Sequence, residues 1–320
     1  MIQELSIRNF KSIRSLDLNC RRVNVFIGDP NAGKTNILEG LGMFCAEVRE
    51  KLKEVSRLDE AVGMFWNQDP TNRISFALDS TGVLLERKQN GVAATAIPGK
   101  QQGFSGSWND ILGVEHRTGE SSCRYYLFKE TANQWGGNDS SLLPPFGENI
   151  ASLLYSNKEA RQSAGKFFAG SGLKLTVDYT AKRLTLVKEE DDVLVAFPYS
   201  TASETLRRMI FYHLALETNE NQVLLFDEPE AHSFPPYTKT LAERIALDDR
   251  GNQFFLTTHS PYMLDSLLSK TPAEELNVVL CRMEDFETKV YSLNQEQIDQ
   301  IKEWSMDAFF NFDRLLPENS

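Results

Sequence analysis

The sequence predicts an α/β protein in which helices cover a mixed sheet. Two apolar runs, VLLFDE at 223–228 and QFFLTTHS at 253–260, are continuous rather than alternating, as in parallel strands buried on both faces. A third run, RRVNVFIG, stops at Gly28, and the apolar residues after Lys34 follow helical spacing. A strand, a turn and a helix in this order form the unit from which parallel sheets are built.

Composition and charge exclude several classes of protein. The chain has 320 residues, of which 41% are hydrophobic and 25% charged, as in an ordinary globular protein. No run approaches the roughly 18 apolar residues of a membrane span, and the four cysteines form no CxxC pair. We therefore expect a cytoplasmic protein with reduced thiols and no membrane contact. The net charge of −11 argues against a surface coated with DNA-binding charge, although a local basic strip leaves DNA contact open.

The middle of the chain predicts a separate antiparallel lobe beside the main sheet. Short β-like runs broken by turn residues fill about 60–130, namely RISFALDS, GVLLERKQ and SCRYYLFKE. Another hairpin is expected at 174–192, KLTVDYTAKRLTLVKEEDD, with its charged end as a solvated edge or tip. From residue 203 the apolar residues lie on one helical face, which makes His213 a core histidine.

A glycine-rich loop separates the first buried strand from its helix. The segment GDPNAGKT matches the pattern G-x-x-x-x-G-K-[ST] at Gly28, Gly33, Lys34 and Thr35. Glycines let backbone N–H groups curl around phosphate oxygens, and the helix start directs its positive dipole end at the same anion. Lys34 would reach the β- and γ-phosphates, and the Thr35 hydroxyl would hold Mg²⁺. The strand and helix on either side favour a nucleoside triphosphate site over a glycine-rich turn without a ligand. The other candidate nucleotide contacts here are Asp29, Pro30, Asn31, Ala32 and Asn36.

Two carboxylates end the apolar run at 223–228. The C-terminal ends of parallel strands meet at the edge where ligands of α/β sheets bind, so Asp227 is placed to hold Mg²⁺. Glu228 is placed to orient or deprotonate an attacking water. The alternative is a pair that only caps the next helix, but the phosphate loop upstream favours the catalytic role.

A histidine and a polar helix start complete the candidate set. His259 follows the run QFFLTTHS and would stabilise charge on the γ-phosphate. The alternative interpretation is that His259 is a loop histidine that only hydrogen-bonds to the backbone. Ser200 begins the small, polar stretch before the helix at 203, which is either an ordinary helix cap or an anion site. From the residues alone, the cap is favoured.

These motifs together resemble SMC-like ABC ATPases, the group that includes RecF-type and OLD-type proteins. The opening IQELSIRNFKSIRSLDL and the loop VNVFIGDPNAGKTNILEGL are similar to the N-terminus of that group. LLFDEPEAH resembles its Walker B motif and D-loop, LTTHSPYML its histidine switch, and YSTASETLRRMIFYHLALE takes the place of its signature helix. The resemblance covers about 1–50 and 195–270. It implies a P-loop NTPase of ABC or SMC-head type, a mixed sheet with helices plus an antiparallel β lobe and a helical signature lobe.

The resemblance also implies roles for individual residues. ATP and Mg²⁺ are the implied cofactors, and the implied catalytic residues are Lys34, Glu228 and His259. Two heads would associate head to tail as a homodimer or higher homo-oligomer, with Ser200 of one copy on the γ-phosphate held by the other. Lys11 would also touch the nucleotide. Ala202 stands where the family has glycine, and its methyl group is expected to weaken or reshape the closed dimer.

We expect a single ABC-type ATPase domain over residues 1–320. Its parts are lobe I at about 1–130, an inserted or helical lobe at about 131–215, a core at 216–270 and a C-terminal segment at 271–320. About 60 residues follow His259, too few for the Toprim nuclease domain of OLD-type proteins, so we expect a head without one. Such heads are often paired with a separately encoded effector in anti-phage defence or DNA repair. The Q-loop glutamine has no clear place, Gln134 being one candidate.

Three functions compete on this basis. The first is an ATP hydrolase whose nucleotide-driven dimerisation regulates an effector. The second is a switch or scaffold that binds nucleotide without turnover, which the altered signature motif favours slightly. The third, the ATPase subunit of a membrane transporter, is disfavoured by the IRNFKS opening and by the DEPEAH and THSP motifs.

Overall fold

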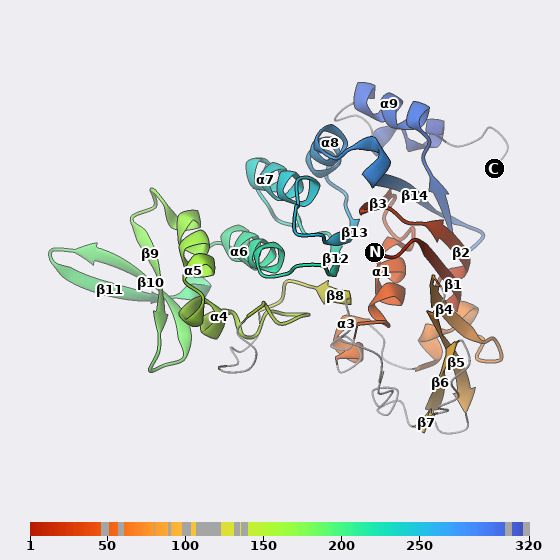
Figure 1. Ribbon diagram of the computed structural model, residues 1–320, viewed down its shortest axis with the longest axis horizontal. Coiled ribbons are helices and arrows are strands. Elements are labelled where there is room, and N and C mark those ends of the chain that lie inside the picture. The colour runs from red at the N-terminus through yellow and green to blue at the C-terminus, as the bar shows by residue number, and fades with distance from the viewer. Residues whose placement is uncertain are drawn as a thin grey trace.

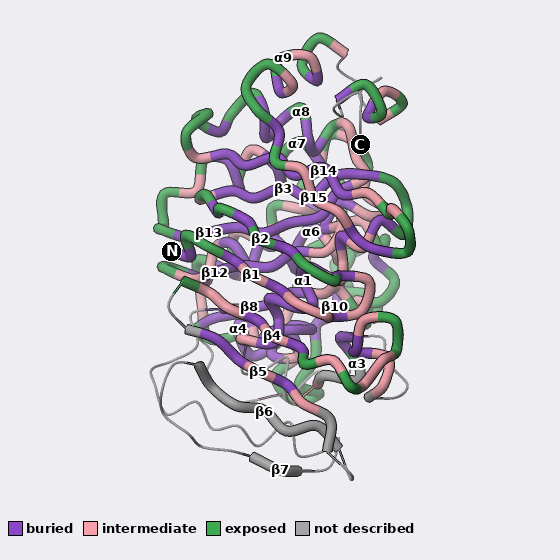
Figure 2. The backbone as a smooth tube through the Cα atoms, turned by 90° about the vertical axis from the view of Figure 1, so that its right-hand side faces the viewer, coloured by how far each residue is buried: buried purple, intermediate pink, exposed green. Residues whose placement is uncertain are grey.

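A six-stranded mixed sheet forms the centre of the computed structural model. The structure describes residues 1–45, 51–56, 61–79, 81–88, 91–97, 104–106, 123–130, 135, 140–304 and 309–315. The strand order of the central sheet is β15-β14-β3-β13-β12-β8, and every neighbouring pair is parallel except β14 and β15. Its strands are β3 (Val23–Gly28), β8 (Cys123–Tyr126), β12 (Val223–Asp227), β13 (Gln253–Thr257), β14 (Leu276–Glu284) and β15 (Glu287–Ser292). Every residue of β13 is buried, as its continuous apolar run predicted, and every residue of β3 is buried as well. Figure 2 shows these strands as buried segments across the middle of the molecule.

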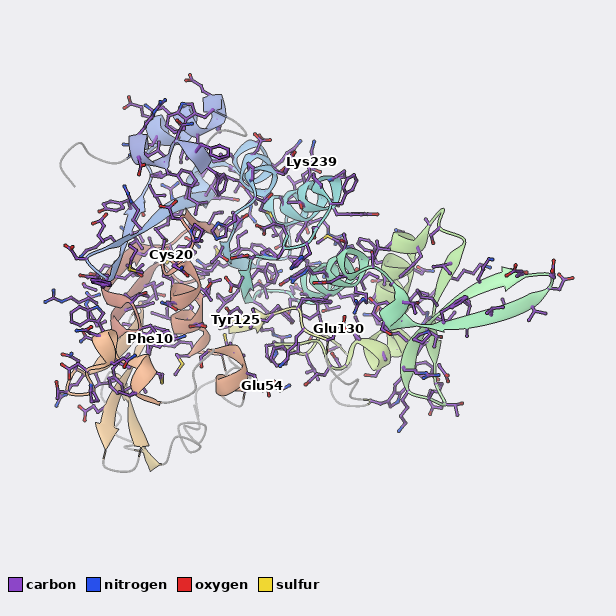
Figure 3. All side chains as sticks on the ribbon, turned by 180° about the vertical axis from the view of Figure 1, so that it is seen from behind. Phe10, Cys20, Glu54, Tyr125, Glu130 and Lys239 are labelled. Atoms are coloured by element: carbon purple, nitrogen blue, oxygen red, sulfur yellow. The ribbon has the colours of Figure 1, made fainter. Side chains whose placement is uncertain are left out.

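An antiparallel sheet lies beside the central one, in the order β2-β1-β4-β5-β6-β7. Its strands are β1 (Glu4–Phe10), β2 (Ile13–Asn19), β4 (Ile74–Leu78), β5 (Thr81–Lys88), β6 (Gly91–Ile97) and β7 (Phe104–Gly106). The predicted antiparallel lobe is therefore confirmed for RISFALDS and GVLLERKQ. It is wrong for SCRYYLFKE, because β8 joins the central sheet parallel to β12. Tyr125 and Tyr126 are both fully buried, so this strand is covered on both faces rather than on one (Figure 3).

A smaller antiparallel sheet, in the order β11-β10-β9, stands at one end of the long axis (Figure 1). Its strands are β9 (Leu173–Asp178), β10 (Arg183–Glu190) and β11 (Val193–Pro198). The expected hairpin is β9 with β10, and β11 adds a third strand. The charged stretch lies at the exposed turn between β10 and β11, where Asp191 and Asp192 both take left-handed backbone angles.

Helices cover both faces of the central sheet. The α-helices are α1 (Lys34–Gly42), α3 (Leu52–Val55), α4 (Ile150–Ser156), α5 (Lys158–Gly165), α6 (Glu204–Glu217), α7 (Pro235–Ala246), α8 (Pro261–Lys270) and α9 (Gln295–Trp304). Short 3-10 turns are η1 (Ala61–Met64), η2 (Trp66–Gln68), η4 (Lys166–Phe168), η5 (Tyr199–Thr201), η6 (Ala273–Glu275) and η8 (Phe312–Leu315). In Figure 1, α6, α7 and α8 lie on one side of β12 and β13, and α1 lies on the other. Within the described residues, no helix is both long and apolar enough to cross a membrane.

Two hydrophobic cores result from this layering, one on each face of the central sheet. Alternate residues of β12 face opposite cores: Leu224 and Phe226 pack with the α6–α8 side, and Leu225 packs with the α1 side. His213 on α6 is buried, and its Nε2 lies 3.0 Å from Ser163 Oγ and 3.0 Å from Glu217 Oε2. It is the core histidine that the helical spacing predicted. The four cysteines are buried.

Candidate active site

The phosphate loop leaves β3 and enters α1 through two glycines that no other residue could replace without strain. Gly28 has φ 136° and Gly33 has φ 86°, both in the region that favours glycine. A Cβ on Gly28 would lie 2.1 Å from the backbone oxygen of Cys281 in β14. One on Gly33 would lie 1.9 Å from Thr288 Oγ1. The loop is therefore held tightly between its neighbours.

Gly28→Ala is expected to unfold this edge of the sheet. Because the clash is with backbone of a paired strand, neither atom can move away, and we expect a loss of more than about 2 kcal/mol in unfolding free energy. Gly165→Ala is the matched control, since a Cβ there meets nothing within 4 Å. Thermal melting of both variants measures the difference. Equal melting temperatures would contradict the packing described for Gly28.

Lys34 lies within the loop, with only 5% of its surface exposed. Its Nζ donates to the carbonyl oxygens of Gly28 at 2.9 Å and Asp29 at 2.8 Å. Burial lowers the pKa of the ammonium group, and the carboxylates of Glu228 and Asp227 oppose that shift. A buried cation that is bonded only to carbonyls gains strongly from an anion, so the residues present fit a phosphate ligand.

Thr35 and Asp227 meet at the end of β12, as the metal assignment requires. Thr35 Oγ1 donates to Asp227 Oδ1 at 3.1 Å. Thr257 donates to the same oxygen at 2.6 Å, and its hydroxyl accepts from the backbone N–H of Glu228 at 2.9 Å. Sequence reasoning missed Thr257, whose role comes from its register opposite Asp227 in the sheet. The strand register was the only signal that could have found it.

Glu228 and His259 lie side by side at the ends of adjacent strands. His259 Nε2 is 3.5 Å from Glu228 Oε1, and both side chains are partly exposed to solvent. Burial, followed by the positive charge of Lys34, lowers the pKa of His259. A neutral imidazole beside a carboxylate is suited to proton transfer or to hydrogen bonding near neutral pH.

Glu230 is a further acidic residue at this site, and sequence reasoning did not single it out. Its side chain is buried, and Oε1 accepts from Thr258 Oγ1 at 2.5 Å and from the backbone N–H of His259 at 3.1 Å. Burial raises its pKa to about 7. The position of the acid within DEPEAH gave no sign of this burial, because acidic residues in turns are usually exposed.

The raised pKa of Glu230 predicts a pH-dependent stability. In the unfolded chain the Glu230 carboxyl has its ordinary pKa of 4.5 and so releases its proton at a lower pH than in the folded protein. This stabilising contribution is complete below pH 4.5 and is lost as pH rises through about 7. We expect Glu230→Gln to gain about 2–3 kcal/mol of unfolding free energy relative to wild type between about pH 5 and pH 8, at ~1.4 kcal/mol per pKa unit. Urea denaturation of both proteins at both pH values measures this difference in unfolding free energy. A difference that does not change with pH would show that titration of Glu230 is not its cause.

The remaining loop residues differ in where the structure places them. Asp29, Pro30 and Asn31 are exposed, whereas Ala32 is buried. Asn36 Nδ2 donates to Ser12 Oγ at 2.7 Å, so Asn36 braces the loop from the helix side. Lys11 lies next to Ser12 in the turn between β1 and β2. Its Nζ pairs with the buried Glu39 on α1 and donates to the oxygen of Ser56 at 2.6 Å.

Ser200 lies apart from the phosphate loop of its own chain. It belongs to η5, ahead of α6, and the start of α6 and α1 lie on opposite sides of β12 in Figure 1. Ser203, not Ser200, caps α6 by accepting from Leu206 N at 3.3 Å. Gln134 lies outside the described residues.

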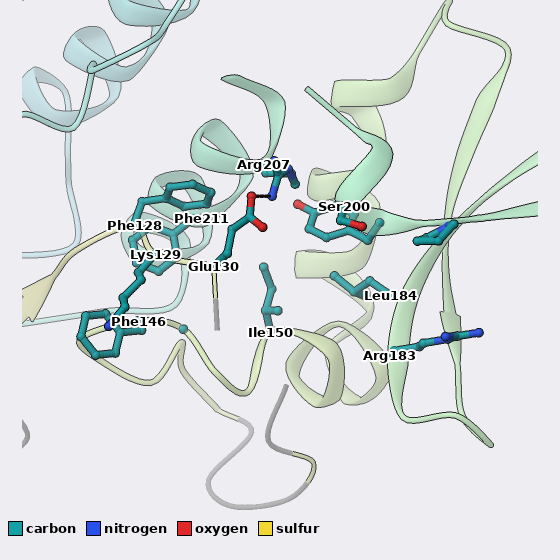
Figure 4. Close-up of a pocket in the computed structure, with 13 residues that line it drawn as sticks. Phe128, Lys129, Glu130, Phe146, Ile150, Arg183, Leu184, Ser200, Arg207 and Phe211 are labelled. Atoms are coloured by element: carbon teal, nitrogen blue, oxygen red, sulfur yellow. Dashed lines mark hydrogen bonds and ion pairs between the residues drawn. The ribbon is translucent and has the colours of Figure 1, made fainter. Parts of the chain in front are cut away.

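Ser200 lines a pocket of about 250 Å³, as Figure 4 shows. Its apolar walls include Phe128, Ile150 and Phe211, and the ion pair of Arg207 with Glu130 closes one side. In the first turn of α6, Thr205 Oγ1 donates to His232 O, in the segment that follows β12, at 2.7 Å.

The fold is that of ABC-type SMC heads, and family models show that the chain is an ATPase. Residues 101–265, just over half of the chain, match the family model described as "AAA domain, putative AbiEii toxin, Type IV TA system". Residues 1–92 match the model "AAA ATPase domain". The chain therefore belongs to the AAA-domain ATPase family described by the first of these models.

Solved structures of SMC heads share this fold. One is an SMC head bound to the C-terminal winged-helix domain of ScpA, with 13% identity, 92% of this chain and 99% of that chain covered and a TM-score of 0.58. The SMC head domain from Thermotoga maritima has 11% identity, coverage of 92% and 99% and a TM-score of 0.51. A head from Pyrococcus furiosus with an extended coiled coil, bound to the C-terminal domain of ScpA, has 13% identity, coverage of 94% and 98% and a TM-score of 0.54. None of the curated proteins compared matches the chain in sequence.

Proposed function

We propose that this ATPase hydrolyses MgATP between two copies of the chain arranged head to tail, and that this association regulates a separate effector protein. One observation carries the proposal. Lys34, Glu228 and His259 gather at one edge of the sheet, while the start of α6 with Ser200 is exposed elsewhere on the same chain. A second copy would supply Ser200 to the γ-phosphate.

Each residue has a role that its surroundings support. Lys34 and the N–H groups of the loop bind the phosphates of ATP. Glu228 takes the proton of the attacking water, and neutral His259 hydrogen-bonds to the γ-phosphate. Thr35 and Asp227, whose side chains hydrogen-bond to each other, would hold Mg²⁺ together with the phosphates. When bound, the metal supplies charge neutralisation at the phosphates.

The effector part of the proposal is supported by the comparisons. The family description names a toxin of a toxin–antitoxin system, and two of the similar SMC heads are bound to a second protein, ScpA. An ATPase that changes its association with nucleotide can expose or cover such a partner surface. These likenesses support our proposal of a role in bacterial anti-phage defence, with DNA repair as the second candidate.

Phosphate release tests this function. Wild-type protein is incubated with MgATP, with and without EDTA, and with and without duplex DNA or the product of the neighbouring gene. We expect Mg²⁺-dependent release that the gene product or DNA changes several-fold. Lys34→Ala, purified identically, sets the background. If ATP still drives dimer formation but phosphate release never exceeds this background in any arm, the protein is a non-hydrolysing scaffold instead of an ATP hydrolase.

A further inference from the structure

We propose that Glu230 is a positioning residue, which holds the turn carrying His259 so that its imidazole faces Glu228. This inference rests on the proposed hydrolysis and adds to it a residue without contact to substrate. Glu230 lies two residues after Glu228, in the segment that follows β12, and its side chain crosses to the end of β13.

The contacts of Glu230 fix the backbone of the histidine turn. Oε1 accepts from Thr258 Oγ1 at 2.5 Å and from His259 N at 3.1 Å. Thr258 Oγ1 in turn accepts from Ser260 N at 2.9 Å. The Thr258 hydroxyl and the backbone N–H of His259 thus depend directly on Glu230 Oε1, and the backbone N–H of Ser260 depends on it through Thr258. Pro261 then begins α8 and limits movement on the far side.

The histidine ring depends on this support. In the part of the chain that the structure describes, its one polar contact is with Glu228 Oε1 at 3.5 Å, which is too long for a strong hydrogen bond. The ring's place is therefore set by its backbone rather than by side-chain partners. A displacement of about 1 Å at a reacting group can lower a rate ~100-fold.

Glu230 is itself anchored. Its backbone carbonyl accepts from Ser233 N at 2.9 Å, and the next turn accepts from Thr205 of α6 through His232 O at 2.7 Å. The second oxygen, Oε2, is buried and has no hydrogen-bond partner among the residues that the structure describes. Burying a carboxyl group with an unpaired oxygen lowers stability. We therefore attribute the burial of Glu230 to its hydrogen bonds through Oε1, which hold Thr258 and the backbone of His259 in place.

The test compares three substitutions under steady-state turnover of ATP. Glu230→Ala is expected to lower kcat at least about 10-fold with KM for ATP within about 2-fold, because Lys34 and the loop are untouched. Glu230→Gln keeps an acceptor oxygen and is expected to retain kcat within about 3-fold. Thr258→Val removes the hydroxyl at nearly constant shape and serves if the alanine variant does not fold; it is expected to lower kcat about 5-fold or more.

A double-mutant cycle with His259 separates positioning from general damage. In a His259→Ala background, Glu230→Ala is expected to lower kcat by less than about 2-fold further, since the group it positions is gone. An additive loss in that background, or a glutamine variant as slow as the alanine variant, would overturn the proposal.

A readout that needs no turnover keeps this inference distinct from the proposed function. The chain has four histidines, so their ring signals can be assigned by NMR. Glu230→Ala is expected to shift and broaden the His259 ring signal, and Glu230→Gln to restore it. If wild type does not hydrolyse ATP but these signals change as expected, the proposed function fails and the positioning stands. An unchanged His259 signal in the alanine variant would sink the positioning itself.

Discussion

Glu228→Gln is expected to lower phosphate release at least about 100-fold while leaving ATP binding intact. The amide keeps the size of the side chain and its contact distance to His259, but it cannot accept a proton from water. Lys34 bonds to the loop carbonyls and Thr35 bonds to Asp227, so neither hydrogen bond depends on this carboxylate. Because bound ATP would no longer be consumed, we expect dimers to accumulate, as measured by light scattering with ATP present.

Glu220→Gln is the matched control for this change. Glu220 is an exposed carboxylate just before β12, at the opposite end of the strand from Glu228. We expect wild-type release and no stable dimer from it. Turnover at the wild-type rate in Glu228→Gln would remove Glu228 from the catalytic assignment.

Lys34→Ala is expected to weaken ATP binding by about 100-fold, or ~3 kcal/mol, because charged hydrogen bonds to phosphate are lost. The Lys34 side chain is buried in the loop, with only 5% of its surface exposed. Binding of a fluorescent ATP analogue measures the change. We also expect no ATP-dependent dimer from this variant at concentrations that saturate the wild type.

Lys239→Ala controls for the loss of one positive charge. Lys239 is exposed on α7, away from the loop (Figure 3), so its variant should bind ATP as the wild type does. A Lys34→Ala variant that binds equally well would contradict the phosphate site. A loss in both variants would point to overall charge instead.

Features of the fold that depend on local sequence could be predicted. The phosphate loop is readable because left-handed backbone angles at Gly28 and Gly33 require glycine, and the apolar runs of β12 and β13 reveal strands buried on both faces. β8 was misplaced because a run of four residues between turn signals shows too little pattern to separate an antiparallel edge from a buried parallel strand.

Features of the site that depend on long-range pairing could not be predicted. Thr257 and Glu230 act through partners about 30 positions away, and only the register of β12 beside β13 brings them together. The same limit applies to Lys11, whose partner Glu39 lies 28 positions further along the chain.

The central claim, that a second copy completes the active site, is tested most directly by mixing two inactive variants. Lys34→Ala removes the phosphate site, and Ser200→Asp places a negative charge on the exposed start of α6 that should face the partner's γ-phosphate. Each variant alone should release no phosphate. In an equal mixture only the mixed dimer would contain an intact composite site, one of its two, so we expect recovery of up to about half of the wild-type rate. A mixture as inactive as its components, or a Ser200→Asp variant as active as wild type, would contradict a site shared between two copies.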